Sequence, residues 1–134
     1  MRVRMEEASM ARILVVDDEA TLRNLIMIAL QGAEYSVVDA PDAWTGLDVL
    51  EQDSEIELVI TDFTMPGMNG LEFGFRVRER YPDKKLILMT ALVGAEANRI
   101  TEEAVLEIGF EMVICKPFGL PVFLGAVERA LAKK

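Results

Sequence analysis

The sequence contains no histidine among its 134 residues and has a single cysteine, Cys115. Without histidine the chain has no imidazole-based catalytic triad, no histidine metal ligand and no phosphohistidine of its own. With one cysteine it has no internal disulfide and no zinc site built from several thiolates. These absences exclude a disulfide scaffold, histidine-based catalytic triads, and metal centres built from histidines or from several cysteines.

Long apolar runs and basic charge are also scarce. The longest apolar run, residues 25–30, is far below the roughly 18 residues of a membrane span. The first ten residues are charged and lack the apolar centre of a signal peptide, so residues 1–10 are expected to form a flexible arm. The net charge of −9 disfavours phosphate backbones and anionic lipids. We expect a soluble, cytoplasmic protein that binds neither nucleic acid nor membrane.

The rest of the chain, residues 11–134, reads as one domain because it is about as long as a single domain and half apolar. Five short runs are nearly continuous in valine, isoleucine and leucine, which is typical of parallel strands buried on both faces. The run at 35–38 is the most polar and is expected at an edge of the sheet. The predicted strands cover residues 12–16, 35–38, 57–61, 85–89 and 112–115.

The segments between these runs show helical spacing of apolar residues, and within residues 22–30 this spacing places Leu25 in the apolar stripe. Gly32 and Gly109 are interpreted as helix stops, and Pro121 suits a first turn, whereas Gly74 weakens the helix around it. A strand followed by a helix five times over predicts an α/β, doubly wound (βα)5 fold, with a parallel sheet and helices on both faces. The predicted helices cover residues 22–30, 41–51, 70–80, 97–108 and 120–131.

Polar residues follow four of the predicted strands. Asp17 and Asp18 follow the first, Asp62 the third, Thr90 the fourth and Lys116 the fifth. Each alone is more often a cap or turn residue, but in a parallel sheet all of them meet at one edge, where ligands bind. Three carboxylates repel one another unless a cation holds them, and Mg²⁺ prefers carboxylate and phosphate oxygens. Together these groups are the parts needed for phosphoryl transfer to an aspartate.

Four separate motifs occur here in order: VVDDE at 15–19, DFTMPGMNG at 62–70, MTA at 89–91 and KPF at 116–118. With these motifs the sequence closely resembles the receiver domain of bacterial two-component response regulators, the CheY-like family, from about residue 11 to the end. The resemblance implies a flavodoxin-like sheet with strand order 2-1-3-4-5.

The resemblance also implies roles for the polar residues. Asp62 would be the phosphoacceptor. Asp17 and Asp18 would hold Mg²⁺ together with Asp62 and the backbone carbonyl of Thr64.

Three further roles follow from the same resemblance. The hydroxyl of Thr90 would follow the phosphoryl group as the switch residue, and Lys116 would pair with it. Pro117 would carry a cis peptide bond that directs Lys116 inward, which is possible because cis bonds are essentially confined to proline.

The sequence departs from the family pattern near the fifth strand. Val113 stands where relatives usually carry tyrosine, phenylalanine or histidine, and Leu92 is an apolar residue two places beyond Thr90. The span from Thr90 to the lysine is longer than usual, with the excess before Gly109. We therefore expect residues 91–109 to rearrange on activation, and a downstream protein partner to bind through residues 91–134.

The leading hypothesis is a signalling switch and not an enzyme: a stand-alone receiver in a phosphorelay that takes a phosphoryl group from a histidine kinase or histidine phosphotransfer protein. One alternative is a small aspartate-nucleophile phosphatase of the haloacid-dehalogenase type, although that class needs Asp-x-Asp after the first strand. Others are a receiver cut from a larger regulator, and a scaffold without chemistry. Cys115 is expected to be a buried strand residue, and Met65, Met68 and Met89 are expected to pack near the site.

Overall fold

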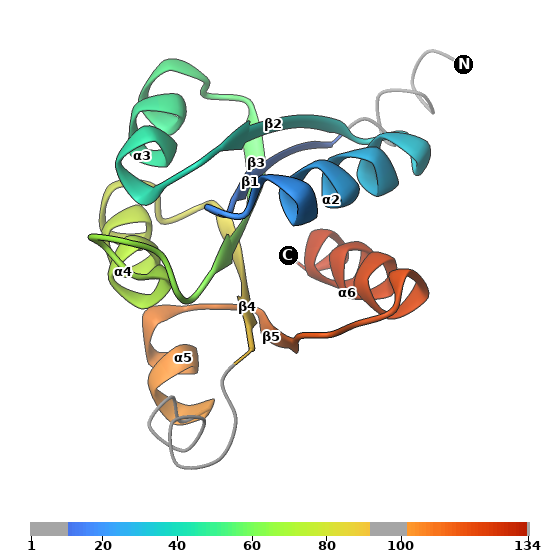
Figure 1. Ribbon diagram of the computed structural model, residues 1–134. Helices are drawn as coiled ribbons and strands as arrows, with labels where there is room; N and C mark the ends of the chain where they lie inside the picture. The colour runs from blue at the N-terminus through green and yellow to red at the C-terminus, as the bar shows by residue number, and fades with distance from the viewer. Residues whose placement is uncertain (1–10, 92–101, 134) are drawn as a thin grey trace.

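The computed structural model describes residues 11–91 and 102–133. Within them strands and helices alternate along the chain, and the strands form one parallel sheet in the order β2-β1-β3-β4-β5 (Figure 1). The elements are β1 (Arg12–Val16), α2 (Ala20–Gly32), β2 (Ser36–Ala40), α3 (Ala43–Gln52), β3 (Ile56–Asp62), α4 (Gly70–Arg80), β4 (Lys85–Thr90), α5 (Glu102–Ile108), β5 (Met112–Cys115) and α6 (Leu120–Ala132). The predicted doubly wound fold and strand order are confirmed.

The sheet is buried between two layers of helices, with α2 and α6 on one face and α3, α4 and α5 on the other (Figure 1). Successive side chains of a strand point to opposite faces, so each buried strand must be apolar at every position. In β1, Leu14 and Val16 pack in one core with Phe73, while Ile13 and Val15 pack in the other. This explains why the strand sequences are continuous apolar runs.

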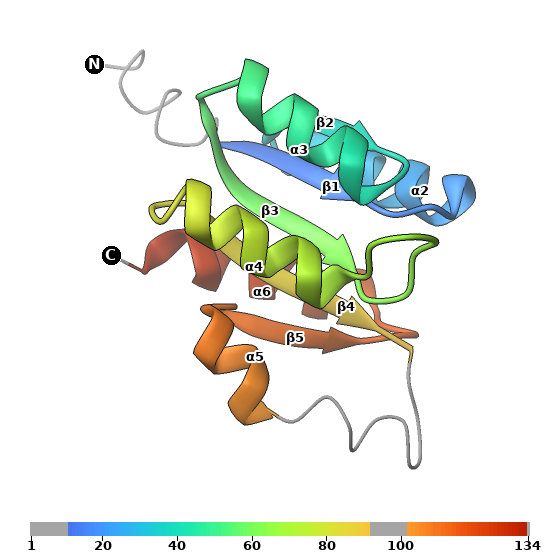
Figure 2. The same cartoon turned by 90° about the vertical axis from the view of Figure 1, so that its left-hand side faces the viewer.

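All strands run in the same direction, so their carboxyl ends lie along one edge of the sheet (Figure 2). Three strands, β2, β3 and β4, extend further toward this edge than predicted. Asp62 is the last residue of β3 and Thr90 the last of β4, so both are still held by the sheet. β2 is an edge strand as expected, but it reaches Ala40, and helix α3 begins only at Ala43.

Helix α2 differs from the prediction in two ways. Gly32 is its last helical residue and not the stop; the left-handed residue that follows is Glu34, with φ of 71°. Leu25, placed in the predicted apolar stripe, is 56% exposed. The fully buried residues of this helix are Ile26 and Leu30, so the side of the helix that carries these two residues is the one that packs in the core.

Gly74 lies inside α4, and packing explains its presence there. A Cβ at this position would lie 2.4 Å from Cζ of Phe110, whose ring is buried against the helix. A side chain larger than hydrogen therefore could not be accommodated without displacing the ring. The helix contains the glycine because it permits this close approach, although glycine weakens a helix in isolation.

The expectation that Cys115 is buried was wrong. It is the last residue of β5, an edge strand, and its side chain is exposed. Met65, Met68 and Met89 are buried in the cores, as expected.

Part of the predicted fourth helix, including Ala97 and Ile100, lies outside the described residues, as do Leu92 and residues 1–10. In the described part of the chain, no helix is long and apolar enough to cross a bilayer.

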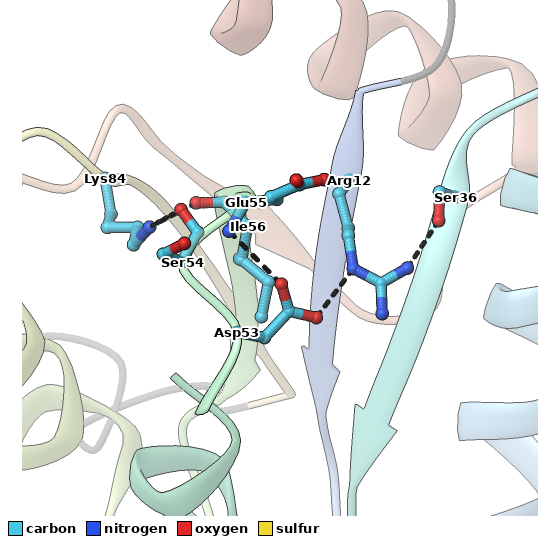
Figure 3. A network of polar contacts seen from close by, with 7 residues as sticks. All are labelled: Arg12, Ser36, Asp53, Ser54, Glu55, Ile56 and Lys84. Atoms are coloured by element: carbon cyan, nitrogen blue, oxygen red, sulfur yellow. Dashed lines mark hydrogen bonds and ion pairs between the residues drawn. The ribbon is translucent and has the colours of Figure 1, made fainter. Parts of the chain in front are cut away.

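A polar network ties the strands together at the amino edge of the sheet (Figure 3). The guanidinium of Arg12 pairs with Asp53, with 2.7 Å between Nε and Oδ2, and donates a hydrogen bond of 2.6 Å to Ser36 Oγ. Beside it, Lys84 donates hydrogen bonds to the carbonyl oxygens of Ser54 and Ile56. The network joins β1, β2 and the start of β3 at the end of the sheet opposite to the aspartates.

Candidate functional site

Three carboxylates meet at the carboxyl edge of the sheet. Asp17 follows β1, Asp18 is the next residue, and Asp62 ends β3; one oxygen from each lies within 4.8 Å of the others. The adjacent pairing of β1 and β3 produces this approach, since Val16 pairs with Thr61 in the ladder. Asp17 is completely buried and Asp62 nearly so, whereas Asp18 is exposed. The structure thus brings together the three carboxylates that the sequence singled out.

Lys116 reaches this cluster from the end of β5. Its Nζ lies 3.0 Å from Oδ1 of Asp62 and 3.6 Å from Oδ2 of Asp17. Its backbone N–H donates a 2.7 Å hydrogen bond to the carbonyl of Thr90, and the Lys116–Pro117 peptide bond is cis, as the resemblance implied. The lysine side chain is only 16% exposed, so its charge acts on the carboxylates with little screening from solvent.

The carboxylates and the ammonium shift one another's pKa values. Burial raises the pKa of Asp62; the hydrogen bond and charge of Lys116 oppose this, and the charge of Asp17 adds to it, so the net pKa is above the ordinary value. Burial lowers the pKa of Lys116, but the hydrogen bond to Asp62 and the charges of Asp17 and Asp62 outweigh it, so the pKa is raised. The lysine is therefore a cation at neutral pH, and one cation only partly offsets the three carboxylates.

The two carboxylate oxygens of Asp17 have different surroundings. Oδ1 accepts a 3.0 Å hydrogen bond from the backbone N–H of Glu19. Oδ2 is buried and has no hydrogen-bond partner in the described part of the chain. A buried oxygen in this condition is costly, and such atoms are rare in folded proteins. Together with the neighbouring carboxylates of Asp18 and Asp62, this oxygen offers the hard donor set that suits Mg²⁺.

The loop after β3 is held close to Asp62. A Cβ on Gly70 would lie 2.2 Å from the carbonyl oxygen of Asp62, so only glycine permits this approach. Met65 and Met68 bury their side chains in the core and anchor the loop between them. Thr64 lies in this loop with an exposed side chain. That its carbonyl serves as a ligand stays a prediction.

Thr90 is positioned by the sheet. It ends β4, is 7% exposed, and follows Met89, which pairs with Asp62 in the ladder. Since β4 lies between β3 and β5, Thr90 stands at the same edge as Asp62 and Lys116. The residue is in the expected place, and its role as the switch hydroxyl stays a prediction.

Arg23, which was not predicted from the sequence, also contacts the site from α2. Its Nη1 donates a 2.6 Å hydrogen bond to the backbone carbonyl of Asp17, and its Nε lies 2.8 Å from Oδ2 of Asp39. An arginine in the first turn of a helix is usually an ordinary surface residue, and the sequence spacing between Arg23 and Asp39 does not indicate that they are in contact. Only the pairing of β1 with β2 brings these groups together.

An open, mainly apolar pocket borders the site beside the lysine. It is lined by Leu22, Ala91, Lys116, Pro117 and Phe118. The pocket gives an incoming group an apolar surface next to the ammonium and the carboxylates.

Comparison with known proteins agrees with this geometry. Residues 13–128 match the family described as the response regulator receiver domain. A chemotaxis protein CheY homolog of Campylobacter jejuni is 34% identical over 123 residues, which cover 90% of this chain and 92% of that protein. The structure of response regulator protein TrrA from Thermotoga maritima in complex with Mg²⁺-BeF has a TM-score of 0.79 and 30% identity, covering 90% of this chain and 99% of TrrA.

Other relatives are longer. The alkaline phosphatase synthesis transcriptional regulatory protein SphR of Synechococcus elongatus is 35% identical over 117 residues, which are 81% of this chain but 44% of SphR. The chain spans less than half the length of several such regulators. The family match over residues 13–128 nevertheless includes Asp17, Asp62 and Lys116 at the acidic edge. This chain belongs to the response regulator receiver domain family.

Proposed function

We propose that this receiver accepts a phosphoryl group on Asp62 from the phosphohistidine of a histidine kinase or a histidine phosphotransfer protein. The observation that carries the proposal is the ion pair between Asp62 and Lys116 beside two further carboxylates. An aspartate that is buried, paired with a cation and located next to metal-binding oxygens has the surroundings of a phosphoryl acceptor. The TrrA relative, solved with Mg²⁺-BeF, supports the same interpretation.

In the proposed reaction a carboxylate oxygen of Asp62 forms a bond to phosphorus, and the phosphorus–nitrogen bond of the phosphohistidine breaks. The electron pair of the broken bond returns to the imidazole nitrogen of the donor. Lys116 stays protonated and pairs with a phosphoryl oxygen, while the hydroxyl of Thr90 donates a hydrogen bond to another. Electrostatic stabilisation of this kind is the main contribution that a protein makes to phosphoryl transfer.

Mg²⁺ is the proposed cofactor. Asp17, Asp18, Asp62 and the carbonyl of Thr64 would hold the ion. The strongest sign of such a ligand is Oδ2 of Asp17, which is buried and, among the described residues, has no hydrogen bond and only the ion pair with Lys116 at 3.6 Å. When bound, Mg²⁺ supplies positive charge that neutralises phosphoryl oxygens.

The proposed output is a change in protein binding and not catalytic turnover or contact with nucleic acid. The net charge of −9 makes the chain a poor partner for a phosphate backbone. Adjacent aspartates after β1, in place of Asp-x-Asp, argue against a phosphatase of the haloacid-dehalogenase type. We propose that residues 91–134 contact the downstream partner in the cytoplasm.

Intact-mass spectrometry tests the assignment directly. With a small phosphodonor such as acetyl phosphate and Mg²⁺, the mass of the wild-type chain should rise by one phosphoryl group, and Asp62→Asn should abolish the gain. Asp53→Asn is a matched control, since it makes the same change at the opposite edge of the sheet. Full modification of Asp62→Asn at another residue contradicts the assignment. Sustained hydrolysis of a phosphate ester over many turnovers favours the phosphatase instead.

A further inference from the structure

Arg23 links three elements at the acidic edge. The residue lies in the first turn of α2, and its guanidinium bridges the backbone carbonyl of Asp17, after β1, and the carboxylate of Asp39, in β2. The arginine side chain is 15% exposed and that of Asp39 is 37% exposed, whereas Asp17 is buried, so the contact with the Asp17 carbonyl is the better shielded of the two. Hydrogen bonds that involve a charged group in such surroundings are stronger than neutral ones.

The contact with Arg23 completes a set of restraints on Asp17. The backbone N–H of Asp17 donates to the carbonyl of Ala40 at 3.2 Å, and its own carbonyl accepts from Arg23 at 2.6 Å. Its Oδ1 accepts from the N–H of Glu19 at 3.0 Å. The backbone and one carboxylate oxygen are therefore held by the protein, and the other oxygen, Oδ2, remains directed toward Lys116 with no hydrogen-bond partner in the described residues.

We propose that Arg23 is a positioning residue for the cation site. By holding the carbonyl of Asp17 against β2, it fixes the turn from which Asp17 and Asp18 present their oxygens to Asp62. The inference rests on the proposed Mg²⁺ site. Partners of this kind, one step removed from a metal ligand, strengthen binding because they orient the ligand before the ion arrives.

Charge and geometry make opposite predictions for the loss of this arginine. Removing a positive charge near three carboxylates strengthens their attraction for a cation. Removing the bridge lets the turn at Asp17 move and weakens binding. The sign of the change in Mg²⁺ affinity therefore separates a positioning role from an electrostatic one.

Arg12, in β1, provides a matched control at the opposite edge of the sheet. At the amino end of β1 it forms the same kind of bridge, to Asp53 on one side and Ser36 on the other (Figure 3). Arg12→Met removes a comparable ion pair and hydrogen bond, which join β1 to Asp53 at the end of α3 and to Ser36 in β2, but at the edge remote from the carboxylates.

The experiment is a calorimetric titration of metal-free protein with MgCl₂, accompanied by urea unfolding in chelator. Arg23→Met is expected to weaken Mg²⁺ binding by about ten-fold, a typical effect of losing such a partner. Arg23→Lys keeps the charge but reaches only one of the two acceptors, so its affinity should lie between those of Arg23→Met and the wild type. Arg12→Met should bind Mg²⁺ as the wild type does, even though its stability falls.

Two results would overturn the inference. One is wild-type or tighter Mg²⁺ binding by Arg23→Met. The other is an equal loss of Mg²⁺ affinity in Arg12→Met, which would show a general effect of stability. If Arg23→Met does not fold, wild-type affinity in Arg23→Lys overturns the two-point bridge. If the wild-type chain binds no Mg²⁺, the proposed metal site itself fails.

Discussion

Lys116 and Asp62 form an ion pair between β5 and β3, two strands separated in the sheet by β4, with 3.0 Å between Nζ and Oδ1. The same ammonium lies 3.6 Å from Asp17, so one lysine neutralises part of the charge of two buried carboxylates. The pair links the last strand to the centre of the sheet through a charged hydrogen bond, and the first predictions depend on it.

Replacing the lysine should destabilise the protein. Lys116→Met leaves both carboxylates without their cation, and losing a hydrogen bond to a charged group costs about 2 kcal/mol. Urea unfolding in chelator should show a loss of that size. Lys133→Met is the control, because the exposed pair of Lys133 with Glu111 contributes at most about 1 kcal/mol. Equal losses in the two variants would contradict the importance of the buried pair.

Asp62 should make stability depend on pH. Its pKa is raised above the ordinary 3.8 mainly by burial, so the ionised form is less favourable in the folded than in the unfolded chain. The resulting penalty is absent below pH 3.8 and fully present once the pH exceeds the folded-state pKa. In chelator, the stability of Asp62→Asn relative to the wild type should therefore rise as the pH increases through this window. A relative stability that is flat or falls with pH would contradict the raised pKa.

Asp18 should matter for the metal more than for the fold. Because the three carboxylates repel one another, Asp18→Asn should melt at a higher temperature than the wild type in chelator. It should also lose the upward shift in melting temperature that Mg²⁺ produces in the wild type. Asp48→Asn, an exposed change on α3, should keep that shift. An unchanged Mg²⁺ shift in Asp18→Asn would remove this residue from the proposed site.

Two helical glycines should respond in opposite ways to alanine. Gly74→Ala places a methyl group 2.4 Å from the Phe110 ring and should lower the free energy of unfolding by about 1–3 kcal/mol. Gly32→Ala meets no atom within 4 Å and should raise it by up to about 1 kcal/mol, since alanine favours the helix. Thermal unfolding of both variants checks the packing of α4 against Phe110.

The switch should involve more than Thr90. Hydrogen bonds to a charged group contribute about 1.5–3 kcal/mol each. Moving the equilibrium between the inactive and active states from 1:99 to 99:1 takes about 5.5 kcal/mol, which is more than one such bond supplies. Val113 stands where relatives usually carry an aromatic residue or histidine, and it has no ring that could move inward and supply the remaining free energy. Amide chemical shifts should therefore change across residues 91–109 when beryllofluoride is added to the Mg²⁺-bound protein. Changes confined to the surroundings of Asp62 would show that the output lies elsewhere.

The order of elements and the edge that carries the chemistry could be predicted from the sequence. A strand buried on both faces must be apolar throughout, so the strands were visible as continuous runs, and a parallel sheet brings their polar ends together. The positions of Asp17, Asp62, Thr90 and Lys116 followed from that rule and from the motifs.

Tertiary packing decided what local patterns could not specify. Helical spacing placed Leu25 in an apolar stripe, but the sheet covers only the side of α2 that carries Ile26 and Leu30. Cys115 is exposed because β5 is an edge strand, which depends on strand order and not on the residue. The bridge from Arg23 to Asp17 and Asp39 joins residues brought together by strand pairing, and such long-range contacts leave no periodic signal in the sequence.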